Sequence, residues 1–271
     1  MRATINISNL SPFEFRVHDD ADIFVSDQIL KHGIWEPCET ELFCRLIRPG
    51  NTVLDIGANI GYYTSIASRL IGEAGKVFAF EPEPRNFGVL DWNARNSEFD
   101  NIVAINQAVA DYVGECSLHI SPENLGHHSV LESIEHNAIE AVSVTSLDDY
   151  FADNLPKTNF VKIDVEGGEQ KVLEGMKDIM ALNCAHLIVV MEFWPIGLNE
   201  APGGLSKMLE TMRSSFEYYM VVREEEMSIS EVSFDEIVEI GKTGIVNDPD
   251  VLVNFVCFTS RDSFEAAKQS F

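Results

Sequence analysis

Short apolar runs alternate with amphipathic stretches between residues 50 and 110. The runs at 52–56, 76–80 and 101–109 predict buried strands, because they are short and rich in aliphatic residues. The stretches 61–70 and 85–96 place apolar residues at helical spacing. This order predicts a βαβαβ half of a doubly wound sheet, whose strands are parallel and joined by right-handed crossovers.

The same alternation returns in the second half of the chain. Strands are predicted at 159–165 and 185–194 around a helix at 168–180, and a further helix, strand and final strand follow at 205–214, 217–222 and 251–260. The fold class is therefore α/β, a Rossmann-like mixed seven-stranded sheet with helices on both faces and a closing antiparallel hairpin.

Two segments depart from this alternation. Residues 1–48 are expected to form a helical or irregular extension, and residues 49–271 the main domain. Near 112–146 two short strand patterns flank a polar stretch, which predicts an inserted hairpin with a long loop.

Composition narrows the class of protein. The longest apolar run, residues 186–194, is far shorter than the roughly 18 residues of a membrane span. The N-terminal residues lack the basic start and following apolar stretch that indicate secretion, so we expect a cytoplasmic location. The five cysteines form no C-x-x-C pair, which argues against a zinc cluster or a disulfide framework.

The net charge of −25 bears on the partner. Nucleic-acid affinity comes largely from Lys and Arg that neutralise phosphates, so we expect no nucleic-acid partner. A small-molecule or neutral acceptor fits better. A homo-oligomer is compatible with the sequence.

The segment "VLDIGANIG", residues 53–61, carries the first chemical signal. Gly57 and Gly61 follow a predicted strand and precede a helix, as in nucleotide-binding turns. One glycine of the dinucleotide pattern G-x-G-x-x-G is missing, and Asp55 adds negative charge where a pyrophosphate would lie. A cationic cofactor without phosphate, such as S-adenosylmethionine, fits this turn better than NAD.

Glu81 stands at the end of the next predicted strand, in "VFAFEPEP". An acidic side chain at that place can accept hydrogen bonds from a ribose diol. The alternative is a solvated carboxylate at a strand end.

Four segments, "VLDIGANIGYYT", "FEPEPRNFGVLDWNARN", "NQAVAD" and "VKIDVEGGE", resemble the FkbM family of methyltransferases in order and spacing, over roughly residues 30–195. The resemblance implies a class I methyltransferase fold and S-adenosylmethionine-dependent O-methylation. The acceptor would be a hydroxyl of a small molecule, a natural product or a glycan.

The resemblance also implies roles for individual residues. Asp55 and Gly57 would line the methionine end of the cofactor, and Asn59 and Gly61 would shape the turn. The remaining expected cofactor contacts are Glu81 and Pro82 at the ribose, Gln107 and Ala108 near the adenine, and Glu36 and Thr40 at the N-terminal side. For Glu36 and Thr40 helix capping is an equal alternative.

Candidate catalytic residues follow the later strands. Asp164, in "KIDVEGG", is expected to orient the cofactor or to accept the hydroxyl proton, and helix capping is its alternative. Glu166 lies just beyond it and could face the acceptor. His128, next to His127 in a polar loop, is a candidate general base because histidine titrates near neutral pH.

Asp164, Glu166 and Glu192 could converge on a hard cation such as Mg²⁺. Nothing in their spacing requires it, and we expect no metal site. Two other functions stay open, an NAD-dependent oxidoreductase and a non-catalytic methyltransferase-like binding module.

Overall fold

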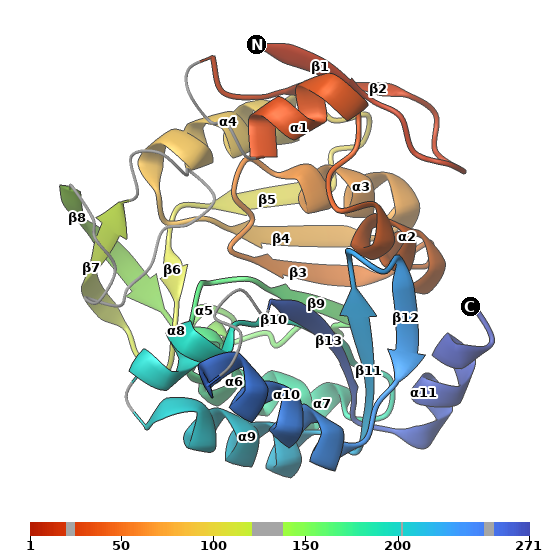
Figure 1. Cartoon of the computed structure of the whole chain (residues 1–271). Helices are drawn as coiled ribbons and strands as arrows, with labels where there is room; N and C mark the ends of the chain where they lie inside the picture. The colour runs from red at the N-terminus through yellow and green to blue at the C-terminus, as the bar shows by residue number, and fades with distance from the viewer. Residues whose placement is uncertain (20–24, 121–137, 202, 247–251) are drawn as a thin grey trace.

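A computed structural model describes residues 1–19, 25–120, 138–201, 203–246 and 252–271. Its centre is a sheet of eight strands (Figure 1). In spatial order the strands are β12 (Ser228–Glu231), β11 (Tyr218–Arg223), β13 (Val253–Phe258), β10 (Ile188–Phe193), β9 (Phe160–Ile163), β3 (Thr52–Ile56), β4 (Lys76–Phe80) and β5 (Ile102–Ile105).

The five strands from β10 to β5 run parallel. β13 lies antiparallel between β10 and β11, and β12 pairs antiparallel with β11 at the edge. The chain builds outward from β3 through β4 to β5, then returns to β9 on the other side of β3. Strand order therefore reverses at β3 and β9, which is where open α/β sheets bind ligands.

Two layers of helices cover the sheet, as each strand's alternation requires. Val53 belongs to the apolar core under α2 (Pro37–Leu46), α3 (Tyr62–Ile71) and α11 (Arg261–Lys268). Leu54, the next residue, belongs to the opposite core. That second layer contains α5 (Leu147–Tyr150), α6 (Glu169–Glu174), α7 (Lys177–Asn183), α8 (Pro195–Glu200), α9 (Gly204–Ser215) and α10 (Phe234–Val246).

The N-terminal residues add a hairpin of β1 (Arg2–Ile5) and β2 (Phe13–Arg16), followed by α1 (Val25–His32). This unit packs on α4 (Pro84–Arg95), at the top of Figure 1. The Asn93 side chain joins them, because its Nδ2 donates to the carbonyls of Arg16 (3.0 Å) and Ile60 (2.8 Å).

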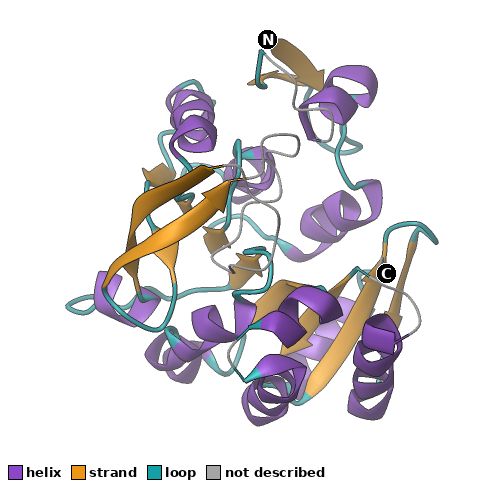
Figure 2. Ribbon diagram, turned by 60° about the vertical axis from the view of Figure 1, so that its left-hand side comes forward, coloured by secondary structure: helices purple, strands orange, loops and turns teal. Residues whose placement is uncertain are grey.

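A second, three-stranded sheet stands beside the large one (Figure 2). It consists of β6 (Ala108–Val109), β7 (Gly114–Ile120) and β8 (Ala138–Thr145), with β7 and β8 antiparallel. β7 and β8 flank residues 121–137, which include His127 and His128 and lie outside the described residues.

The expected α/β fold is confirmed, and two details differ. The sheet has eight strands rather than seven, because the acidic segment after Arg223 forms β12 and then α10. The expected strand at 101–109 is divided into β5 and β6, which belong to different sheets. No helix within the described residues is long and apolar enough to cross a membrane.

Candidate active site

A cavity of about 550 Å³ opens at the carboxyl ends of the parallel strands, between the large sheet and the small one. Its wall draws on Gly57 and Asn59 after β3, Glu81 and Pro82 after β4, Gln107 and Ala108 after β5, Cys116 to His119 of β7, and Asp164 to Gly168 after β9. The topology therefore brings together turns that are far apart in the sequence.

The glycine turn has the backbone that its sequence suggested. Gly57 has φ +82°, and a Cβ there would lie 1.8 Å from the carbonyl oxygen of Asp164. Gly61 has φ +86°, and its Cβ would lie 2.6 Å from Leu90 Cδ1. Gly57 is thus required by close approach to a backbone carbonyl as well as by left-handed φ, whereas Gly61 is required by left-handed φ, since Leu90 Cδ1 is the end of a flexible side chain.

Glu81 is buried in the cavity wall. One carboxylate oxygen accepts from the backbone N–H of Asn59 and the other from that of Glu83, both at 2.8 Å. These bonds fix the carboxylate beside the glycine turn. Burial nevertheless raises its pKa to about 8.

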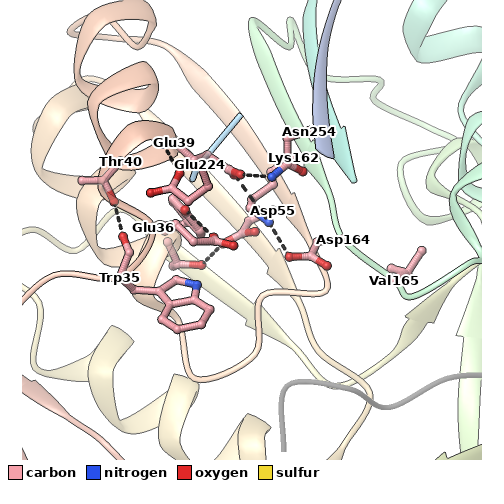
Figure 3. Close-up of polar contacts among 12 residues, drawn as sticks. Trp35, Glu36, Glu39, Thr40, Asp55, Lys162, Asp164, Val165, Glu224 and Asn254 are labelled. Atoms are coloured by element: carbon pink, nitrogen blue, oxygen red, sulfur yellow. Dashed lines mark hydrogen bonds and ion pairs between the residues drawn. The ribbon is translucent and has the colours of Figure 1, made fainter. Parts of the chain in front are cut away.

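A buried ion network lies beneath the cavity (Figure 3). Lys162 is 3% exposed, and its Nζ lies 2.6 Å from Asp164 Oδ2 and 3.7 Å from Glu39 Oε1. The second oxygen of Glu39 accepts from Asn254 Nδ2 at 2.5 Å. Burial lowers the pKa of Lys162, but the carboxylates of Asp164, Glu39 and Glu36 outweigh it and hold that pKa well above its usual range.

Four of the expected cofactor residues, Gly61, Asp55, Thr40 and Glu36, are not among the described residues of the cavity wall. Asp55 is buried, and its Oδ2 accepts from Thr64 Oγ1 at 2.5 Å. Thr40 Oγ1 donates to the Trp35 carbonyl at 2.7 Å.

Glu36 accepts from the Tyr63 hydroxyl at 2.8 Å, and burial raises its pKa to about 7. Figure 3 shows Glu36 and Asp55 near Lys162. Asp55 and Glu36 thus bond to Thr64 and Tyr63 of α3, the helix that follows the turn, and Thr40 bonds to Trp35. Contact of these residues with a cofactor stays a prediction.

The loop after β9 carries several acids. Asp164 and Glu166 line the cavity, and Glu166 has φ +53°. Glu169 starts α6, where its Oε1 accepts from the backbone N–H of Val165 (3.3 Å) and Gly167 (3.1 Å). Burial raises the pKa of Glu169 to about 7.

Sequence reasoning missed Lys162, Glu224 and Asn254. Lys162 lies two residues before Asp164 on a buried strand. Because side chains two residues apart in a strand point to the same face, the contact between Lys162 and Asp164 could have been predicted from the sequence. Glu224 stands in a run of three glutamates that nothing in the sequence links to the site. Its carboxylate instead accepts from the N–H groups of Cys38 (2.9 Å) and Glu39 (3.1 Å) at the start of α2.

Several known methyltransferases are similar to this chain in sequence. A hexuronic acid methyltransferase, AglP of Haloferax volcanii, is 29% identical over 175 residues, which cover 65% of this chain and 68% of AglP. Methyltransferase 1 of Beauveria bassiana is 26% identical over 46% of this chain and 58% of its own length. The chain thus spans between about half and two thirds of these relatives.

Among solved structures, a methyltransferase FkbM from Methylobacillus flagellatus aligns at a TM-score of 0.44 and 17% identity, over 76% of this chain and 52% of that one. The profile of the methyltransferase FkbM domain matches residues 55–218, more than half of the chain. That segment runs from Asp55 of the glycine turn through the cavity loops to β11. The chain is therefore a methyltransferase and belongs to the FkbM family.

Proposed function

We propose that the protein transfers a methyl group from S-adenosylmethionine to a hydroxyl of a hexuronic acid or a related sugar unit. The observation that carries this proposal is the cavity wall, which joins the glycine turn and Glu81 to the acidic loop after β9. The acceptor class is suggested by AglP, a hexuronic acid methyltransferase that is 29% identical to this chain over 175 residues.

The cofactor would occupy the end of the cavity at β3, β4 and β5. Gly57 leaves the backbone open to close approach, and Glu81 would accept hydrogen bonds from the ribose hydroxyls. Pro82 would lie beside the ribose, and Gln107 and Ala108 would lie near the adenine. Bound there, S-adenosylmethionine supplies a methyl group on a positively charged sulfur.

The acceptor would enter between β7 and the loop after β9. Ser117 and His119 of β7 offer polar atoms to sugar hydroxyls. Lys171, on α6, is the lysine of the described cavity wall, and arginine is absent from that wall. Lys171 would pair with the carboxylate of a uronic acid.

Methyl transfer needs the acceptor oxygen in line with the methyl carbon and the sulfur, so the protein acts mainly by alignment. Glu166 would accept the hydroxyl proton, because it lines the cavity while Asp164 is engaged by Lys162. Asp164, held by that lysine, would orient the acceptor.

Calorimetric titration with S-adenosylhomocysteine tests the cofactor assignment, with NAD⁺ titrated in parallel. We expect S-adenosylhomocysteine to bind and NAD⁺ not to bind. At pH 8.5, above the pKa of about 8 of the Glu81 carboxyl, Glu81→Gln should weaken binding by about 10-fold or more, because hydrogen bonds to a charged group are lost. Glu73→Gln, an exposed acid on the turn before β4, is the matched control.

Mass spectrometry of methyl glucuronosides and methyl glucosides incubated with S-adenosylmethionine tests the acceptor. We expect methylation of the uronoside, and Lys171→Met should raise its KM while leaving any reaction of the neutral sugar unchanged. Binding of S-adenosylhomocysteine without turnover of any sugar would favour the non-catalytic module. NAD⁺ binding alone would favour an oxidoreductase.

A further inference from the structure

Three carboxylates meet at the carboxyl ends of β9 and β10. Asp164, Glu166 and Glu192 each offer one oxygen, and these oxygens all lie within 4.8 Å of one another. The sheet explains the meeting of two of them. Met191 and Ile163 are the last register pair of the parallel strands β10 and β9, and Glu192 and Asp164 come directly after them.

Both side chains also point to the same face of the sheet. Residues two apart in a strand point to the same face, so Glu192 shares the face of Val190, and Asp164 shares the face of Lys162 and Phe160. Val190 and Phe160 both belong to the core under α2 and α3. Glu166 approaches from the turn that follows β9, where its backbone has φ +53°.

Glu192 shows that this group of acids is incomplete. The residue is 8% exposed, and its Oε2 has no hydrogen-bond partner among the described residues. A buried carboxylate oxygen without a donor is strongly disfavoured, because its lost hydration is not replaced. The orphaned residue is one of the three whose oxygens converge, so the same position would satisfy all three.

The positive charge already present does not satisfy the group. Lys162 Nζ bonds Asp164 Oδ2 at 2.6 Å and faces Glu39 at 3.7 Å, so it is shared with a buried acid outside the group. Three carboxylates and one shared ammonium leave an excess of negative charge. A divalent cation would offset it.

We propose that Asp164, Glu166 and Glu192 bind a divalent cation of the Mg²⁺ type. Carboxylate oxygens are hard ligands, and Mg²⁺ is commonly held by one to a few carboxylates while its other positions go to water or substrate. Asp164 and Glu166 line the cavity and are half-exposed, so those other positions would face the acceptor end. The sequence alone led us to expect no metal site.

The role of the cation rests on the proposed function. An acceptor hydroxyl oxygen in one open position would be held beside the cofactor, and a bound cation lowers the pKa of a hydroxyl. Each carboxylate has a second oxygen, so Glu166 could hold the cation and still accept a proton. The site itself requires neither cofactor nor acceptor.

Titration of the metal-free protein with Mn²⁺, followed by electron paramagnetic resonance of the free ion, tests the site directly. We expect one Mn²⁺ per chain, displaced by Mg²⁺. Glu192→Gln should weaken Mn²⁺ binding by at least about 10-fold. Glu210→Gln, an exposed acid on α9, should bind as the unmutated protein does.

Thermal unfolding guards against a folding defect. Glu192→Gln removes a buried carboxylate without a partner, so its Tm in EDTA should equal or exceed that of the unmutated protein, while the rise caused by Mg²⁺ should disappear. Absence of stoichiometric Mn²⁺ binding, or unchanged binding in Glu192→Gln, would overturn the proposal and leave Glu192 as a protonated acid.

The two proposals fail separately. Mn²⁺ binding without methylation of any sugar would refute the proposed function and leave the cation site standing. Methylation that proceeds at full rate in EDTA would refute the cation's role in positioning the acceptor.

Discussion

Asp55 and Lys162 are register partners on the adjacent parallel strands β3 and β9. Both side chains point to the face covered by α2 and α3, where Glu39 of α2 meets the same ammonium. The floor of the candidate site is therefore held by charges from two strands and one helix. Lys162 is the shared cation of this arrangement.

Replacement of Lys162 by methionine should destabilise the protein by about 3–5 kcal/mol, because buried carboxylates lose their counter-ion. Urea unfolding at pH 7 measures the change. Adding Glu39→Gln to Lys162→Met should recover part of the loss, since the two residues are coupled. Lys242→Met removes an exposed pair of 3.9 Å, and a loss there as large as at Lys162 would contradict the explanation.

Glu224 should stabilise α2 from outside the helix. Glu224→Ala leaves the N–H groups of Cys38 and Glu39 without their acceptor, and we expect a loss of about 1–2 kcal/mol. The neighbouring Glu225 is exposed, and Glu225→Ala should change stability by less than about 0.5 kcal/mol. Equal effects in chemical denaturation would show that Glu224 is only another surface acid.

The parts of the molecule that follow local periodicity could be predicted from the sequence. β3, α3, β4 and α4 were predicted to within a few residues, because each is a short buried run or a long amphipathic stretch. Gly57, Asn59 and Glu81 line one cavity because parallel strands end on one side of a sheet, and their contact with a cofactor stays a prediction.

Contacts between distant segments could not be predicted in this way. Nothing local to Glu224 distinguishes it from Glu225, and its partner α2 lies at the other end of the chain. Asn254 reaches Glu39 only because β13 inserts between β10 and β11. The sequence likewise cannot show that no described hydrogen-bond donor reaches Glu192 Oε2, because this depends on the three-dimensional packing.

Gly50 and Gly57 have nearly the same φ, so replacing each by alanine distinguishes the cost of left-handed backbone from the cost of a steric clash. Gly50 has φ +81° and no described atom within 4 Å of an added Cβ, whereas the Cβ at Gly57 would overlap the Asp164 carbonyl. Gly50→Ala should cost about 1–2 kcal/mol, the left-handed penalty alone. Gly57→Ala should cost more than about 4 kcal/mol, or fail to fold. Similar Tm values for the two variants would refute the close approach.

The buried carboxyl of Glu81 should make stability depend on pH. Its pKa is about 8 in the folded protein and 4.5 in its ordinary state, so the folded chain holds this proton over that interval. The contribution is complete below about pH 4.5 and is lost as pH rises toward 8. Between pH 5.5 and pH 8 the free energy of unfolding should therefore fall more in the unmutated protein than in Glu81→Gln. A parallel fall in both proteins would contradict this.

Cofactor affinity should depend on the same proton with the opposite sign. Ribose hydroxyls donate to the ionised carboxylate, so S-adenosylhomocysteine should bind more tightly as pH rises from 6.5 to 8.5. Glu81→Gln should show no such gain, and it corrects for titration of the ligand's own groups. Calorimetry over this range measures the effect, and a gain retained in the variant would assign it elsewhere.

The position of β13 has a consequence for how this protein can be divided. The family match ends at residue 218, yet β13, which begins at Val253, lies between β10 and β11 in the sheet. A fragment cut at the end of the match would expose the whole hydrogen-bonding edge of β10 and deprive Glu39 of Asn254. We therefore expect the matched segment not to fold on its own. An expression fragment should extend at least through Phe258.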